Sequence, residues 1–103
     1  MTRWATGQSD LEAMVTAGDL EQVTPSPENA ARLLAEAERH LRPAELVADS
    51  DPAGGYDLLA AAARKAMAAT LAAQGLRATS KGGHIAVQEA VTAQLGRSGA
   101  VVR

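Results

Sequence analysis

An alanine-rich run over residues 56–74, YDLLAAAARKAMAATLAAQ, constrains the fold of this chain more than any other segment. Alanine has the highest helix propensity of all residues, and the run contains neither glycine nor proline. Gly75 follows directly, and glycine commonly ends a helix in the left-handed conformation. The segment therefore predicts a long helix that ends at Gln74.

The residues available for a core also favour packed helices. Hydrophobic residues make up 47% of the chain, but it has no Phe, one Trp and one Tyr. A core of Leu, Val, Met and Ala suits closely packed helices, because sheets draw on β-branched and aromatic side chains. The 103 residues suffice for one such core and not for two. We therefore expect a single all-α domain over residues 1–103.

A capping box predicts a short helix near the N-terminus. Ser9 supplies the capping hydroxyl, and Glu12, three residues later, supplies the reciprocal acceptor. Gly18 then marks the end of this helix. Together with the arm that precedes it, the helix accounts for residues 1–24.

The second helix is expected to begin at Pro27, with Ser26 as its cap. Pro43 is expected to kink or end it, because proline removes a backbone donor and clashes with the preceding turn. Continuation through residues 44–48 as one or two further turns is the alternative. The apolar residues of this helix recur at helical spacing and are Ala30, Leu33, Leu34, Ala37 and Leu41.

The alanine-rich helix has a start signal in Asp51 and Pro52, a capping residue and a proline suited to the first helical position. Gly54 and Gly55 are expected to delay regular helix until Tyr56, because glycine loses most conformational entropy in a helix. The helix then carries one apolar stripe, formed by Tyr56, Leu59, Ala63, Met67 and Leu71.

The last helix is expected to begin at His84 and to end at Gly96, leaving residues 97–103 as a loose tail. Its apolar stripe starts at the histidine and continues through Val87, Val91 and Leu95. The helices of the chain, joined by short breaks, therefore predict an antiparallel bundle of about four helices.

Charge is distributed unevenly along the chain. Residues 1–51 hold 10 acidic and 4 basic residues, whereas residues 52–103 hold 2 acidic and 6 basic ones. An anionic partner would therefore bind the second half, where Arg64, Lys65 and Lys81 are the expected phosphate contacts. The alternative is that these charges only keep the surface soluble.

Without cysteine, disulfides and thiolate chemistry are excluded. No apolar run suits a signal peptide or membrane span, so we expect a cytoplasmic protein.

Arg77 and His84 are the candidate catalytic residues. At a helix N-terminus the dipole disfavours imidazolium, so His84 is expected to be a neutral, proton-accepting base. Such a base could take a ribose 2′-hydroxyl proton while the Arg77 guanidinium holds the phosphate. The alternative for His84 is a packing or capping role. Gly82 and Gly83 leave backbone amides for a phosphate at the same helix start, although paired glycines most often form a simple turn.

Two other kinds of site fit the sequence poorly. Glu36, Glu38 and His40 are close in the chain, but Glu38 points away from the other two on a helix. A helix-turn-helix would place Lys81 and His84 at positions of its second helix that should be apolar. We therefore expect no metal, no other cofactor and no DNA-reading motif.

The segment from Tyr56 to Val91, with QGLR at residues 74–77 and GGH at residues 82–84, resembles the HEPN family (higher eukaryotes and prokaryotes nucleotide-binding) in a bacterial branch. The resemblance implies a helical bundle, commonly dimeric. It also implies, for many members, a metal-independent RNase of toxin–antitoxin, phage-defence or RNA-processing systems. The family's catalytic Arg and His are separated by four to six residues, a spacing shared by Arg77 and His84. Many members are paired with a nucleotidyltransferase that acts as their antitoxin.

Two functions are open at this point. In the first, the chain is a HEPN-like endoribonuclease or toxin whose homodimer brings two basic loops together around RNA. In the second, it is a non-catalytic HEPN-like module that binds a nucleotide or a partner protein such as a nucleotidyltransferase. HEPN relatives continue into a further C-terminal helix where this chain ends at Arg103. The absence of that helix would expose an apolar stripe and favour association in both cases.

Overall fold

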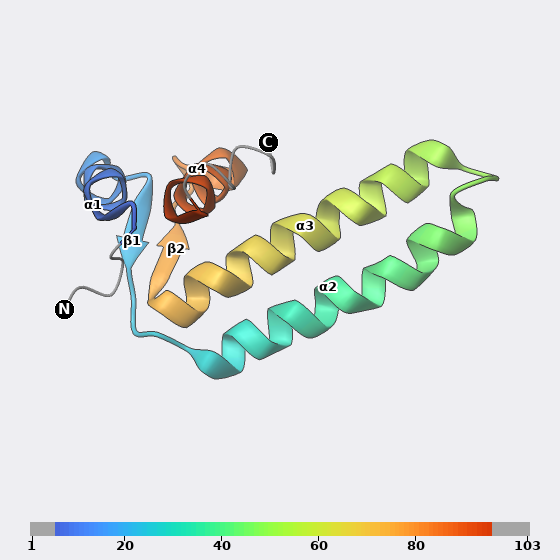
Figure 1. The fold of residues 1–103 in the computed structure, drawn as a ribbon, viewed down its shortest axis with the longest axis horizontal. Helices are drawn as coiled ribbons and strands as arrows, with labels where there is room; N and C mark the ends of the chain where they lie inside the picture. The colour runs from blue at the N-terminus through green and yellow to red at the C-terminus, as the bar shows by residue number, and fades with distance from the viewer. Residues whose placement is uncertain (1–5, 96–103) are drawn as a thin grey trace.

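A computed structural model of the protein describes residues 6–95, which form four α-helices and two short strands (Figure 1). In chain order these are α1 (Gln8–Ala17), β1 (Leu20–Gln22), α2 (Pro27–Val47), α3 (Pro52–Gln74), β2 (Leu76–Ala78) and α4 (Gly83–Leu95). The expectation of an all-α fold is therefore confirmed. Gly96 and the tail expected over residues 97–103 lie outside the described residues.

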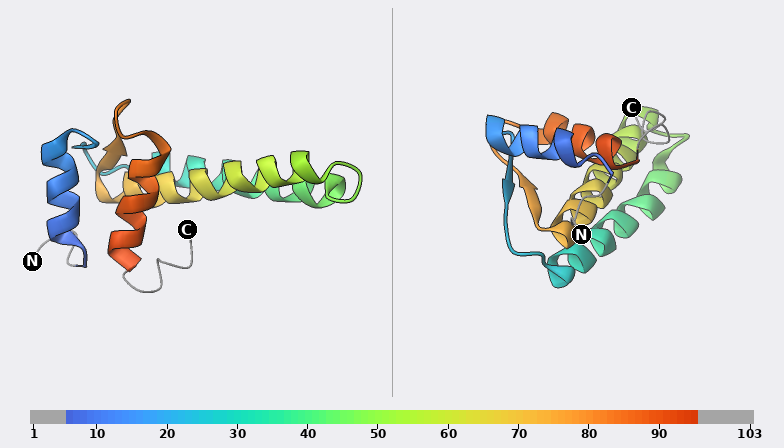
Figure 2. Two further views of the ribbon diagram at one scale, coloured as in Figure 1. Left: turned by 90° about the horizontal axis from the view of Figure 1, so that it is seen from above. Right: turned by 60° about the vertical axis from the view of Figure 1, so that its left-hand side comes forward.

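Helices α2 and α3 form a long antiparallel hairpin, and the other elements form a head at one end of it (Figure 1). Figure 2 shows that α1 and α4 run across the hairpin rather than along it. The molecule measures 47 × 27 × 25 Å, and the hairpin accounts for the long dimension. Away from the head, α2 and α3 therefore pack mainly against each other.

The head is built around large apolar side chains. Leu11, Leu20, Leu71 and Leu76 are each at most 2% exposed, and they come from α1, β1, α3 and β2 respectively. The buried cluster is completed by three residues of α4, which are Ala86, Ala90 and Val91. Five elements from distant parts of the chain thus share one core.

The two strands tie the N-terminal segment to the turn between α3 and α4. They pair antiparallel, with Leu20 opposite Ala78 and Gln22 opposite Leu76. The strands were not predicted, because three residues carry too little alternation to stand out in a sequence. One leucine of each strand, Leu20 and Leu76, is buried in the head, and this burial stabilises so short a pair.

The hairpin is held together by small residues instead. Ala37 and Ala44 of α2 are buried against Gly55, Ala62 and Ala69 of α3. Within each helix these residues are seven positions apart, which is close to two helical turns, so each helix presents a continuous seam of small side chains. The seam lets the two backbones approach closely.

The ends of α2 follow the sequence prediction. Ser26 caps the helix by accepting a hydrogen bond from the Asn29 backbone N–H at 3.1 Å, and Pro27 is the first helical residue. The helix continues through Pro43 to Val47, so continuation is the correct one of the two alternatives. Pro43 is exposed, and the backbone acceptor that it leaves without a partner can be hydrated there.

The predicted start of α1 is wrong, and the predicted start of α3 is right in its cap and first residue but wrong in the delay expected at its glycines. Helix α1 begins at Gln8 after a left-handed Gly7, and the Glu12 carboxylate accepts from the Gln8 side chain at 2.7 Å rather than completing a capping box with Ser9. Helix α3 begins at Pro52 and includes the glycines expected to delay it. Asp51 accepts from the Gly54 backbone N–H at 3.0 Å, so the first turn is capped despite its glycines.

Candidate functional site

Arg77 lies on β2 and is bound to Glu21 on β1. Its Nε donates to Oε1 of Glu21 at 2.7 Å, and Nη2 forms an ion pair with the same oxygen. The strand register places the two residues directly opposite each other. The guanidinium is therefore held by a carboxylate of the same molecule.

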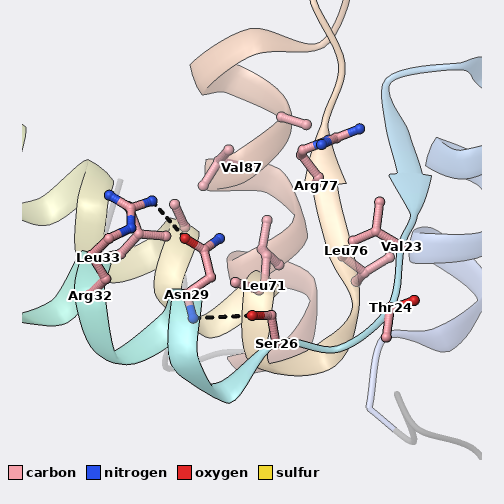
Figure 3. A pocket seen from close by; sticks show the side chains of 13 residues that line it. Val23, Thr24, Ser26, Asn29, Arg32, Leu33, Leu71, Leu76, Arg77 and Val87 are labelled. Carbon is pink, nitrogen blue, oxygen red and sulfur yellow. Dashed lines mark hydrogen bonds between the residues drawn. The ribbon is translucent and has the colours of Figure 1, made fainter.

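Arg77 also borders a cavity that we call the α2–α4 groove (Figure 3). The groove has a volume of about 680 Å³, and its apolar lining includes Leu33, Leu71, Leu76 and Val87. Figure 3 shows Arg32 on α2 and Arg77 on β2 at opposite sides of it. Arg32 donates to the Asn29 side chain at 2.6 Å and to Glu36 at 3.1 Å. The groove thus combines an apolar floor with two arginines that already have partners.

His84 is exposed at the start of α4 and lines a separate cavity with Arg64 and Lys65 of α3. We call these three residues the basic cluster. Ala68 and Val87 line both this cavity and the α2–α4 groove, so the two cavities adjoin. His84 therefore lies with Arg64 and Lys65 in one cavity, whereas Arg77, its predicted catalytic partner, borders the α2–α4 groove.

Lys65 of the basic cluster also links the two long helices. Its Nζ lies 3.4 Å from Oε2 of Glu36 on α2. Burial acts to raise the pKa of Glu36, but the hydrogen bond and charge of Lys65, with the charges of Arg32 and Arg39, outweigh it and hold the pKa below its ordinary value of 4.5. Part of the positive charge near His84 is thus balanced within the hairpin.

The predicted phosphate-binding groups of the β2–α4 loop make internal contacts. The Gly82 N–H donates to the Thr79 hydroxyl at 3.2 Å, and the Gly83 N–H donates to the Thr79 carbonyl at 2.9 Å. The Lys81 ammonium donates to the Ala17 carbonyl at 2.7 Å. In this structure the three groups fasten the loop to itself and to the end of α1.

Glycine suits the two positions of this loop for different structural reasons. A Cβ at Gly82 would overlap the backbone carbonyl oxygen of Asp19, so glycine permits a close approach between the loop and the segment after α1. Gly83 has open space around it but adopts a φ of +55°, in the left-handed region that favours glycine. Steric fit and backbone geometry therefore account for both.

A further groove runs along the hairpin and was not anticipated. Leu34, Leu41 and Leu59 are 47%, 46% and 52% exposed. They lie in what we call the leucine groove, which is lined by Leu34, Ala37, Glu38, Leu41, Leu59, Ala62, Ala63 and Ala66. The sequence assigned these leucines to core-facing stripes, because periodicity identifies an apolar face but not the neighbour that covers it. The missed signal is the seven-residue spacing of small residues, which occupy the seam instead.

The chain matches no family model, and no curated protein or solved structure matches it. No helix between residues 6 and 95 is both long and apolar enough to cross a membrane. In the same range, no three His, Asp or Glu side chains gather in a way that would hold a metal ion. Function is therefore inferred from the basic cluster, the α2–α4 groove and the leucine groove.

Proposed function

We propose that this chain is a HEPN-like interaction module that binds a partner protein and does not cleave RNA. The observation that carries the proposal is the leucine groove, in which Leu34, Leu41 and Leu59 are each about half exposed. Full burial of one leucine side chain is worth roughly 1.5–3 kcal/mol, so a partner that covers all three would gain substantial free energy. Large apolar residues grouped on one surface are typical of interaction sites, whereas single ones are not.

The contacts of Arg77 argue against catalysis. A metal-independent RNase needs a base and a cation at the same phosphodiester. Here the arginine forms an ion pair with Glu21, and His84 lines a different cavity. A phosphate would therefore compete with the Glu21 carboxylate for the Arg77 guanidinium.

RNA cleavage in EDTA tests this part of the proposal. We expect the wild type, His84→Ala and Arg77→Ala proteins all to leave RNA intact. Cleavage by the wild type that is lost in His84→Ala would contradict the proposal. Cleavage of equal rate in all three proteins would identify a contaminating nuclease, which repurification should remove.

The second candidate is a HEPN-like RNase or RNA-binding protein that uses the basic cluster. It is supported by one observation, the exposed His84 beside Arg64 and Lys65 in one cavity. A homodimer that joined two such clusters would present a larger cationic surface to RNA. This candidate predicts that Arg64→Gln with Lys65→Gln weakens RNA binding, whereas Arg42→Gln, on the exposed surface of α2, has little effect.

A further inference from the structure

The α2–α4 groove and the cavity of the basic cluster lie next to each other. The groove has a volume of about 680 Å³ and the adjoining cavity about 320 Å³, both in the range of small-molecule sites. Ala68 and Val87 line both, and each is partly exposed. A ligand that lies over these two residues can therefore contact both cavities at once.

The two cavities offer different surfaces. The groove presents half-buried apolar side chains from three segments of the chain, which are Val23, Leu33 and Val87 (Figure 3). In the adjoining cavity, the lining consists of the basic cluster, two alanines and the shared valine. An apolar chain therefore gains most from the groove, whereas an anionic group gains most from the basic cluster.

Arg64 is the best placed cation for such an anionic group. Its side chain is exposed and forms no ion pair with a residue between positions 6 and 95. A guanidinium can bind both oxygens of a carboxylate or phosphate through two parallel hydrogen bonds. His84, exposed on α4 at the same cavity, adds an imidazole that can donate a further hydrogen bond.

The acidic residues of this region do not cancel that preference. No acidic residue between positions 6 and 95 lines either cavity. Glu36 is held by Lys65 and Arg32. Asp57 lies two turns before Arg64 on the same face of α3, but it is outside both linings and forms no ion pair with a residue in the described range. Positive charge without a partner is therefore concentrated at the basic cluster.

From these observations we propose that the two cavities form one site for a small amphipathic anion. Its apolar body lies in the α2–α4 groove, and its carboxylate or phosphate group binds the basic cluster. The inference goes beyond the proposed function, because the leucine groove shares no lining residue with either cavity. Unlike RNA binding by the second candidate, it requires the apolar groove as well as the basic cluster.

An NMR titration of the isotope-labelled protein with small monomeric probes tests the proposal. Octanoate and octyl phosphate carry the two anionic groups on the same apolar chain, octanol carries the chain alone, and acetate carries a carboxylate alone. The wild-type chain is expected to bind the better anionic probe at least about tenfold more tightly than octanol or acetate. The difference from octanol should shrink as salt is raised. The tighter of the two anionic probes identifies the preferred anionic group.

Two substitutions separate the halves of the site. Arg64→Gln is expected to weaken binding of the anionic probe at least about fivefold and to change that of octanol by less than about twofold. Leu33→Gln, at a residue that lines the groove but not the basic cavity, should weaken both. Arg42→Gln is the matched control, because Arg42 is an exposed arginine outside both cavities, and it should bind like the wild type. Circular dichroism checks that each variant is folded.

The outcomes separate this inference from both candidate functions. Equal affinity for octanol and the anionic probes would overturn the anionic character of the ligand. Anion binding that Leu33→Gln leaves unchanged would overturn the role of the groove, and binding that Arg64→Gln leaves unchanged would overturn that of the basic cluster. If no probe binds, the inference fails as a whole, whereas partner binding at the leucine groove is measured separately and stands or falls on its own. RNA binding that Arg64→Gln weakens, in a protein that binds no probe, would overturn the inference in favour of the second candidate.

Discussion

The head and the hairpin of this molecule bury opposite kinds of side chain. In the head, leucines from four elements are almost completely buried, as Leu11 and Leu76 illustrate. Along the hairpin, away from the head, the buried positions belong to alanine and glycine, and four leucines of the two helices are exposed, which are Leu34, Leu41, Leu46 and Leu59. The comparison indicates that the head is stabilised by its own core, whereas the hairpin leaves large apolar side chains exposed.

The difference follows from how much apolar area each kind of contact removes from water. Hydrophobic stabilisation is roughly proportional to that area, and an alanine seam buries little of it per residue. The same seam lets α2 and α3 approach closely and pushes the longer leucine side chains to the flanks. The hairpin therefore gains close packing but leaves the larger apolar side chains exposed to solvent.

The largest effect is expected from truncating a leucine of the head. Leu71 is 1% exposed, so Leu71→Ala should lower the free energy of unfolding by about 2–5 kcal/mol through lost burial and a cavity. Urea denaturation followed by circular dichroism measures the change. Leu71→Met, which nearly conserves volume, is the control and should lower it by less than about 1.5 kcal/mol. A Leu71→Ala protein with an unfolding free energy close to that of the wild type would contradict the conclusion that the head is stabilised by its own core.

A substitution in the β2–α4 loop should have the next largest effect. Gly82→Ala places a methyl group against the Asp19 carbonyl, and overpacking of this kind costs about 1–3 kcal/mol. Gly83→Asn is the matched comparison, because asparagine tolerates the left-handed region and nothing crowds that position. Thermal unfolding of the two variants should show the larger drop in Tm for Gly82→Ala. The reverse order would mean that backbone geometry matters more here than close approach.

Substitutions in the leucine groove should affect stability less. Leu34→Gln and Leu41→Gln each remove a side chain that is already about half exposed, so we expect losses below about 1 kcal/mol in the free energy of unfolding. Urea denaturation under the conditions used for Leu71→Ala gives a direct comparison. Losses as large as that of Leu71→Ala would erase the contrast between head and hairpin.

The smallest effect concerns the Glu36–Lys65 contact between the two long helices. The pKa of Glu36 is lower in the folded state, so its ionised form stabilises the fold above pH 4.5, and this contribution disappears as the pH falls through the lowered value. The difference in Tm between the wild type and Glu36→Gln should therefore shrink in acid. Glu28→Gln, whose carboxylate has no ion pair within residues 6–95, is the control. A difference independent of pH would exclude the ion pair as its cause.

Local signals predicted most of the fold correctly. The caps at Ser26 and Asp51 and the left-handed Gly75 are read from one or two residues, because they satisfy backbone groups that every helix end leaves unpaired. The strand pair was not predictable in this way. Leu20 and Leu76 become strand residues only because the tertiary fold brings them together over more than fifty positions of chain.

The candidate site was less predictable than the fold. Spacing along the chain suggested that Arg77 and His84 act together, but a β2 residue and an α4 residue can border different cavities even when only six positions separate them. The partner of Arg77 could not be read from the sequence, since Glu21 lies far away in the chain. Helical periodicity likewise identified the leucines of the hairpin but assigned them to the core.

The affinity of a synthetic helical peptide with one leucine stripe for Leu41→Gln tests the central claim most directly. The substitution removes one of the three leucines that line the leucine groove, while the head core remains intact. We predict that the variant keeps its fold by circular dichroism and binds the peptide at least about tenfold more weakly than the wild type, the equivalent of roughly 1.4 kcal/mol. Unchanged affinity in a folded Leu41→Gln protein would show that the leucine groove is not the binding surface.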